Sequence, residues 1–251
     1  MALKDLPPPL PPAERPAGQL VGEAIRAYGR RPWRSFALGI PVAVWTTLPR
    51  LLDEDNPAYR LLPLAGAVLL SAACVAGVAM VAAQPVPLLR PFAAGLVVFL
   101  PFQFLLLFLV LPALAWLAAF GLVVPVLALE RRSFGDAFRR SFALARADVV
   151  HSLGSLAALT IVVVATTAVM TFVLRDFGDQ AVAAASFIAW AIVSPVFFLG
   201  LALLYHDQAA RLDSAGPQRR SDADLHPAVD PDRPGSPDAE IESRAAARGE
   251  P

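Results

Sequence analysis

Residues 91–129 read PFAAGLVVFLPFQFLLLFLVLPALAWLAAFGLVVPVLAL, a run of 39 residues without one charged side chain. A helix rises about 1.5 Å per residue and the hydrocarbon core of a bilayer is roughly 30 Å thick, so one membrane pass takes about 20 residues. The run is long enough for two passes and, at about 58 Å, too long for a single helix. A proline starts a helix more readily than it continues one, so we expect two spans joined by a turn near Pro112.

The composition agrees with a chain surrounded by lipid. Hydrophobic residues make up 57% of the 251 residues and charged residues 17%, an unusual balance for a soluble domain of this length. The formal net charge of zero conceals a division, because residues 1–206 hold 15 basic and 11 acidic side chains and residues 207–251 hold 6 and 10. Arginines outnumber lysines 20 to 1, as in proteins from GC-rich bacterial genomes. We therefore expect an all-α integral membrane protein of a bacterial plasma membrane.

Six apolar segments predict six transmembrane helices. They cover about residues 36–48, 61–83, 91–111, 112–129, 149–174 and 181–204. The first has an uncharged core of only 13 residues and contains Pro41, so it spans the bilayer only if Arg34 and Arg50 extend outward to the headgroups.

The arginines predict the orientation, since basic residues beside membrane spans are retained on the cytoplasmic side. With both termini cytoplasmic, thirteen arginines lie inside: Arg26, Arg30, Arg31, Arg34, Arg90, Arg131, Arg132, Arg139, Arg140, Arg146, Arg211, Arg219 and Arg220. Only Arg50, Arg60 and Arg175 lie outside. An odd number of spans would put one arginine cluster on the wrong face, so the asymmetry also favours six spans.

The two ends of the chain differ in composition from the part between them. Residues 1–18 carry six prolines, and residues 213–251 combine prolines, glycines and charges with few large apolar groups. Such segments bury too little apolar surface to offset the entropy of ordering. We expect a disordered N-terminal tail over residues 1–18, a membrane domain over residues 19–206, and a disordered cytoplasmic tail over residues 207–251.

Two amphipathic segments predict helices along the cytoplasmic interface. In the first, residues 19–31, Leu20 and Ala24 share a face opposite Arg26 and Arg30, and packing against neighbouring loops is an equal alternative. The second follows Ser133 and Asp136, whose spacing matches a helix capping box. Its expected apolar face consists of Phe134, Ala137, Phe138, Phe142 and Ala145.

Five arginines in and before this second helix are candidate contacts for anionic lipid headgroups. They are Arg131, Arg132, Arg139, Arg140 and Arg146. Each arginine near an anionic leaflet contributes about 1 kcal/mol to membrane binding. The alternative is that the cluster only sets the topology and has no specific ligand.

Several of these residues resemble a known family. Pro125 and Glu130 precede the run FGDAFRRSFAL at residues 134–144, which contains Ser141, and the last span ends in Tyr205 and Asp207. This pattern resembles the membrane domain of bacterial glycerophosphoryl diester phosphodiesterases and the related YciC-type small integral membrane proteins, over roughly residues 19–212. Phe142 and Ala209 depart from it, where the family commonly has tryptophan and arginine. The resemblance implies a six-helix membrane module.

The resemblance does not imply phosphodiesterase activity. Those enzymes carry catalysis in a separate soluble barrel, and no segment of this chain is long and polar enough to build one. The three histidines, His151, His206 and His226, have no acid pair at metal-site or triad spacing, and the single cysteine, Cys74, lies in an apolar block. We expect no catalytic residue, metal or other cofactor, although an enzyme that uses interfacial arginines on a lipid headgroup stays a third possibility.

A transporter of small solutes or lipids is the main alternative to a non-enzymatic membrane module. Ion-coupled carriers usually hold ionisable side chains inside the bilayer, and the predicted spans contain none. We expect Gln103, the strongly polar residue of the long uncharged run, to bond to a neighbouring helix. Small residues at four-residue spacing predict close helix packing: Ala72, Ala73, Ala76, Gly77, Gly154, Ala158, Ala185 and Ala189. The expected partners are membrane lipids and a protein partner or second copy, not nucleic acid.

Overall fold

The computed structural model describes residues 11–52, 55–82 and 84–225, and in these ranges it contains helices and no strand. The α-helices are α1 (Ala17–Arg30), α2 (Pro32–Leu51), α3 (Leu62–Val81), α4 (Leu89–Phe108), α5 (Val110–Phe120), α6 (Val123–Leu129), α7 (Phe134–Ala147), α8 (Val149–Val173) and α9 (Asp179–Leu225). Three short 3₁₀ helices accompany them: η2 (Pro12–Glu14), η3 (Pro57–Leu61) and η4 (Arg175–Phe177). The predicted all-α class is confirmed over these residues.

Five segments of the described chain are helical, long and apolar enough to cross a membrane. They are Pro57–Val81, Leu89–Leu106, Val110–Leu129, Val149–Val173 and Asp179–Ser214. They agree with the last five of the six predicted spans to within a few residues, except that the last helix continues past residue 204. The chain therefore has the features of a multi-pass membrane protein.

Helix α2 takes the place of the first predicted span but is not one of these five segments. It has 20 residues rather than the 13 of the predicted core, and its prolines Pro41 and Pro49 lie inside the helix. Arg34 and Arg50 near its two ends lower its mean hydropathy, which is why composition alone does not identify it as a span. One face, with Leu38 and Val42, is buried against neighbouring helices.

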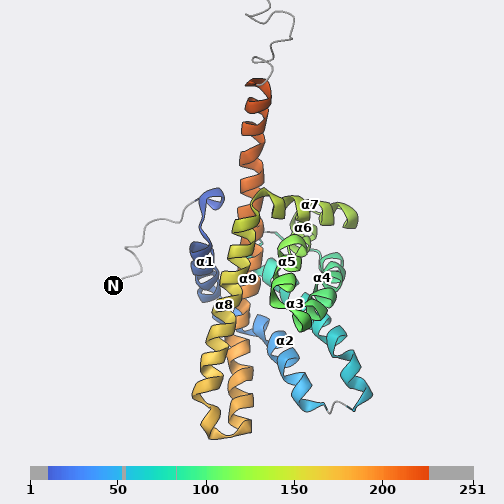
Figure 1. Cartoon of the computed structure of the whole chain (residues 1–251), viewed down its shortest axis with the longest axis vertical. Helices are drawn as coiled ribbons and strands as arrows, with labels where there is room; N and C mark the ends of the chain where they lie inside the picture. The colour runs from blue at the N-terminus through green and yellow to red at the C-terminus, as the bar shows by residue number, and fades with distance from the viewer. Residues whose placement is uncertain (1–10, 53–54, 83, 226–251) are drawn as a thin grey trace, which may run out of the picture.

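The helices pack around α9 (Figure 1). α1, α2, α3 and α8 all contact it, and α8 runs antiparallel beside it. α2 and α3 form a second antiparallel pair, while α7 lies crosswise to α8 and α9 at the end where α8 begins. We call this end the α7 end of the bundle. At about 1.5 Å per residue the 47 residues of α9 extend about 70 Å, and the last part of the helix projects beyond the other helices.

The long uncharged run is divided where the sequence predicts. Leu109 is extended, with φ −160° and ψ 138°, between α4 and α5, and Pro112 lies in the first turn of α5. A second break, which the sequence analysis did not predict, separates α5 from α6 at Gly121 and Leu122. Pro125 has no amide hydrogen to donate to the Gly121 carbonyl, so the regular hydrogen-bond ladder cannot continue through this point.

The predicted tail boundaries are wrong at both ends. Residues 11–18 are not a free tail, because η2 and the start of α1 lie there and Arg15 is buried. At the other end the helix does not stop near residue 206, because α9 continues to Leu225 and Gln208 is fully buried. Polar contacts hold the inner part of each segment, since Arg15 binds Asp207 and Arg211 binds Asp148. The rest of the predicted tails, residues 1–10 and 226–251, lies outside the described residues.

Small residues permit close approach at three helix contacts with α9. A Cβ on Gly39 of α2 would overlap the backbone carbonyl of Ala191, and a Cβ on Gly77 of α3 would lie 3.0 Å from the Cβ of Phe198. Gly200 of α9 itself packs against the side chain of Leu159 in α8. The predicted packing role is confirmed for Gly77, whereas Gly154 of α8 faces open space.

We predict that Gly39→Ala destabilises the protein because the added methyl group forces α2 away from α9. Overpacking of this kind costs about 1–3 kcal/mol, so the midpoint of thermal unfolding in detergent should fall. The matched control is Gly154→Ala, a membrane-helix glycine whose Cβ would meet nothing within 4 Å. Equal melting temperatures for the two variants would contradict the observed packing of α2 on α9.

Candidate functional site

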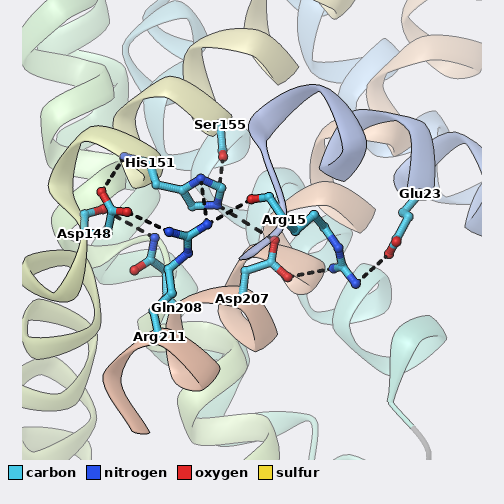
Figure 2. A network of polar contacts seen from close by, with 8 residues as sticks. All are labelled: Arg15, Glu23, Asp148, His151, Ser155, Asp207, Gln208 and Arg211. Atoms are coloured by element: carbon cyan, nitrogen blue, oxygen red, sulfur yellow. Dashed lines mark hydrogen bonds and ion pairs between the residues drawn. The ribbon is translucent and has the colours of Figure 1, made fainter. Parts of the chain in front are cut away.

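Polar side chains gather at the α7 end of the bundle in two clusters. We call the larger one the α8–α9 polar network, and Figure 2 shows it. Its members are Arg15, Glu23, Asp148, His151, Ser155, Asp207, Gln208 and Arg211. They come from the segment before α1, from α1, from the start of α8 and from α9, so the network joins both ends of the membrane domain.

A buried ion pair lies at the centre of this network. Arg15 donates from one guanidinium nitrogen to Asp207 Oδ1 at 2.6 Å, and its other terminal nitrogen lies 3.1 Å from Glu23 Oε2. The side chain of Asp207 is completely buried and that of Arg15 is 9% exposed. A buried carboxylate is tolerated only when it is paired, so the pair holds the N-terminal segment on α9.

Arg211 connects the same region to the start of α8. Its guanidinium donates to Asp148 Oδ2 at 2.8 Å and to the backbone carbonyl of Arg15 at 2.9 Å. Asp148 in turn accepts a hydrogen bond from the amide of His151 at 2.9 Å, which caps the N-terminus of α8. Asp148 therefore both begins α8 and fixes it to α9.

His151, Ser155 and Asp207 meet here, but not as a catalytic triad. In a triad the serine and the carboxylate contact opposite nitrogens of the imidazole. Here Nε2 faces both Ser155 Oγ, at 3.4 Å, and Asp207 Oδ2, at 3.9 Å, whereas Nδ1 faces Arg211 at 3.4 Å. This geometry joins α8 to α9 and does not prepare Ser155 for nucleophilic attack. Within the described residues no group of three or more histidine, cysteine or acidic side chains could hold a metal ion.

The second cluster surrounds Glu130, at the end of α6. Tyr205 of α9 donates to Glu130 Oε1 at 2.9 Å, and Arg140 of α7 lies 3.2 Å from the same oxygen. Arg132 lies 2.5 Å from Oε2. Glu130 thus forms an ion pair with Arg132, which lies close to it in the sequence. Three separate elements, α6, α7 and α9, meet at this carboxylate.

The surroundings of Glu130 lower its pKa. Partial burial favours the neutral form and would raise the pKa of this carboxyl group, but the hydrogen bonds from Tyr205 and Arg132 and the charge and hydrogen bond of Arg140 outweigh it. The pKa therefore lies below its ordinary value of 4.5. Glu130 is ionised at neutral pH and stabilises the contact of α7 with α6 and α9.

The five residues that carry the family resemblance do not form one cluster in the structure. Glu130 and Tyr205 touch each other, whereas Asp207 belongs to the α8–α9 polar network. Ser141 is buried in α7 and donates to the carbonyl of Ala119 at 2.8 Å, and Pro125 is buried in α6. Four of the five thus join helices at the α7 end, and Pro125 accounts for the break before α6.

Helix α7 begins as predicted and buries part of the predicted face, because Ala137 and Ala145 are buried and Phe138 packs partly buried against the core. Ser133 caps it, with its hydroxyl accepting from the amide of Asp136 at 3.3 Å. The buried residues are Ala137, Ser141, Leu144 and Ala145. Phe134 and Phe142, which we expected on the buried face, are 44% and 41% exposed. The small side chains and the Ser141 hydrogen bond bring the helix close to α5, and Phe142 stacks at its edge on the ring of Phe120.

The five candidate headgroup arginines fall into three environments. Arg132 and Arg140 bind Glu130. Arg139 is 88% exposed, and the guanidinium of Arg146 lies 4.5 Å from the centre of the exposed Phe142 ring. Arg131 has a φ of 53° and lines a groove beside α3 and α4. No described contact tests whether any of them binds lipid, so that role stays a prediction.

Sequence reasoning missed Arg15 and the contact of His151 with Asp207. A lone arginine inside a proline-rich leader looks solvated, and its partner Asp207 lies 192 residues away in the chain. The available signal was Asp207 itself, an acidic residue that directly follows an apolar helix. The expected role of Gln103 is confirmed, because it donates to the carbonyl of Pro63 in α3 at 2.7 Å.

Comparison with known proteins adds no relative. The chain matches no protein-family model, and no curated protein and no solved structure matches it. The resemblance to the phosphodiesterase membrane domain therefore stays a prediction.

We predict that Arg15→Met lowers the free energy of unfolding by about 3–5 kcal/mol, because it leaves the Asp207 carboxylate buried without its main partner. Replacing both residues, as Arg15→Met with Asp207→Leu, should cost less than the sum of the single changes. Denaturant titration in mixed micelles measures both values. The exposed pair of Arg175 and Asp176 is the control, and breaking it with Asp176→Asn should cost below about 1 kcal/mol.

A second prediction concerns acid stability. Because the folded-state pKa of Glu130 is lowered, its stabilising contribution is complete above about pH 4.5 and is lost as the pH falls through the folded-state pKa. Between about pH 6 and about pH 3, Glu130→Gln should lose less stability than the wild type. Tyr205→Phe removes a hydrogen bond that lowers the pKa of Glu130, so it should also lose less than the wild type and should complete its loss at higher pH. Identical pH profiles for all three proteins in thermal unfolding would refute this assignment.

Proposed function

We propose that this chain is a non-enzymatic, multi-pass membrane module that organises anionic lipids, and through them or directly a partner protein, at the cytoplasmic face of a bacterial plasma membrane. In this proposal α2 is a sixth span and both termini are cytoplasmic, so the α7 end of the bundle faces the cytoplasm. α1 and α7 then lie where the cytoplasmic headgroups begin.

The length and packing of α2 support the sixth span. Its 20 residues extend about 30 Å, the thickness of the hydrocarbon core, and it lies between α3 and α9. Arg34 and Arg50 near its ends are placed to reach opposite headgroup layers. With α2 as a span, the thirteen arginines named in the sequence analysis lie inside and three, Arg50, Arg60 and Arg175, lie outside.

The observation that carries the lipid role is the outer face of α7. This face combines the exposed rings of Phe134 and Phe142 with the exposed guanidinium of Arg139, and Arg146 stacks over Phe142. α7 also lies crosswise to the spans (Figure 1). Aromatic rings and arginines on one side of such a helix match the boundary between acyl chains and anionic headgroups.

The ion pairs of the carboxylates at the α7 end support a module without catalysis. Carboxylates at the α7 end are engaged by arginines: Asp207 by Arg15, Asp148 by Arg211, and Glu130 by Arg132 and Arg140. A general acid or base needs reach to a substrate as well as a suitable pKa. These pairs instead join helices to one another.

Lipid transport is the second candidate function, and one cavity favours it. A cavity of about 160 Å³ lies among α2, α4, α5, α8 and α9, with Trp45, Phe99 and Trp190 in its wall. Its lining is almost wholly apolar, which suits a hydrocarbon chain and not an ion. The side-chain amide of Gln103 donates to the carbonyl of Pro63. Since this amide is already bound within the protein, it does not favour a site for a polar solute.

Reporter fusions test the topology. Fusions at residue 251 and at the N-terminus should both report the cytoplasm, and a fusion in the segment between α2 and η3 should report the opposite side. Chain ends on opposite sides would remove α2 from the set of spans and overturn this part of the proposal.

Lipid analysis of the protein purified from native membranes tests the function. Anionic phospholipids should be enriched over the bulk membrane, and Arg139→Gln with Arg146→Gln should reduce that enrichment severalfold. The control pair, Arg60→Gln with Arg175→Gln, should leave it unchanged. Flux of labelled lipid across reconstituted vesicles, with no enrichment of anionic lipid, would instead support the transporter.

A further inference from the structure

A groove runs from the loop between α3 and α4 along the seam between these two helices. One cavity, of about 660 Å³, lies beside this loop and the end of α6, and a second, of about 420 Å³, lies between α3 and α4. Leu88 and Leu89 line both cavities, so the two are adjacent. We call the whole the α3–α4 groove.

The end of the groove beside the loop is positively charged. Arg90, Arg131 and Arg132 line it. Arg132 shares its charge with Glu130, but neither Arg90 nor Arg131 forms an ion pair with any residue that the structure describes. Guanidinium groups bind phosphate oxygens through paired hydrogen bonds, so this end is suited to a phosphate group.

The side chain of Arg131 gives a second indication. Its backbone φ of 53° lies in the left-handed region, which is common for the residue that follows the C-cap of a helix, so the end of α6 accounts for it. The side chain lines a further cavity beside Tyr205 and His206 as well as the groove. A charged side chain that lines two cavities and has no described ion-pair partner is available to a ligand.

The other end of the groove is apolar and lies within the membrane spans. Ala72 and Ala76 of α3 and Phe92 of α4 line it. Ala76 is exposed and Ala72 is half-buried, whereas Ala73 and Gly77 on the neighbouring face are buried in the bundle. Counted from the end of α3 at Val81, Ala76 and Ala72 lie about 8 Å and about 14 Å deeper along the helix.

We propose that the α3–α4 groove binds one anionic phospholipid of the cytoplasmic leaflet. Its phosphate contacts Arg90 and Arg131, and one acyl chain follows the seam past Leu89 to Ala76 and Ala72. This inference rests on the proposed function, because it requires that the α7 end face the anionic leaflet.

The match of charge and depth favours a phospholipid over a second copy of the chain. The apolar part of the groove belongs to two membrane-crossing segments, and the arginines follow directly at its loop end. A phospholipid has this same order, with an acyl chain in the hydrocarbon and a negative phosphate at its edge. The alanines leave room along the seam for one narrow chain.

The test uses the full chain, delipidated in detergent and titrated with phosphatidylglycerol or phosphatidylcholine, with native mass spectrometry counting the bound lipids. The wild type should bind one phosphatidylglycerol with preference over phosphatidylcholine. Arg90→Gln and Arg131→Asn should each weaken that binding about tenfold, the effect of losing one charge-assisted contact. Ala76→Phe, which fills the seam, should weaken the binding of both lipids.

Matched controls separate the groove from general effects. Arg175→Gln removes an exposed charge outside the groove, and Ala168→Phe adds a ring to an exposed alanine of α8, so both should bind as the wild type does. Arg131→Gly, which suits the backbone conformation, repeats the loss of charge if Arg131→Asn folds poorly. Thermal unfolding of each variant shows that it is folded.

Each remaining outcome overturns the inference in a distinct way. Anionic lipid that stays bound in all groove variants refutes the groove and leaves the proposed function intact. Failure of the wild type to prefer anionic lipid refutes both. A change of oligomeric state in Ala76→Phe, with lipid binding unchanged, shows that a second copy of the chain covers the groove.

Discussion

The buried carboxylate of Asp207 is the constraint on which the α7 end of this protein depends. Without exposure to water it requires a cation, and Arg15 supplies one from a segment 192 residues earlier. Arg211, one turn further along α9, then binds Asp148 and the Arg15 carbonyl, which places the start of α8 beside the same segment. Since α1, α2, α3 and α8 all pack on α9, these few polar contacts position the N-terminal segment against the whole helical core.

The arginines fall into two groups, those paired with internal carboxylates and those that are exposed or line the groove. Arg15, Arg140 and Arg211 are engaged with internal carboxylates and stabilise contacts between helices. Arg139 is exposed on α7, where it lies 3.9 Å from the exposed carboxylate of Asp136, and Arg131 lines the α3–α4 groove. An exposed positive charge at the edge of a membrane domain attracts the anionic leaflet, whereas a charge buried against a carboxylate does not reach it. The second group of arginines is therefore the part of the molecule available to lipids, whereas the first group is structural.

Residue patterns predicted where α7 begins, but they predicted only part of the face that it buries. Ser133 and Asp136 determine where the helix begins, because capping is a local interaction between residues three apart. The choice of buried face is not local. Ala137 and Ser141 face inward because α5 approaches closely enough for the Ser141 hydroxyl to reach the Ala119 carbonyl. Hydrophobicity ranks Phe134 and Phe142 above serine, so it predicts burial for two rings that are exposed and misses the buried Ser141.

The sequence by itself determined the helical class, five apolar spans and the break near Pro112, because hydrogen-bond geometry and bilayer thickness act on consecutive residues. Tertiary structure alone decided that Arg15 binds Asp207, that Glu130 binds Tyr205 and that Arg211 of α9 binds Asp148. Each of these depends on which distant groups become neighbours once the helices pack. Composition contains no information about distances between groups far apart in the chain. It therefore predicted solvated segments at the proline-rich leader and after residue 206, where Arg15 binds Asp207 and Arg211 binds Asp148.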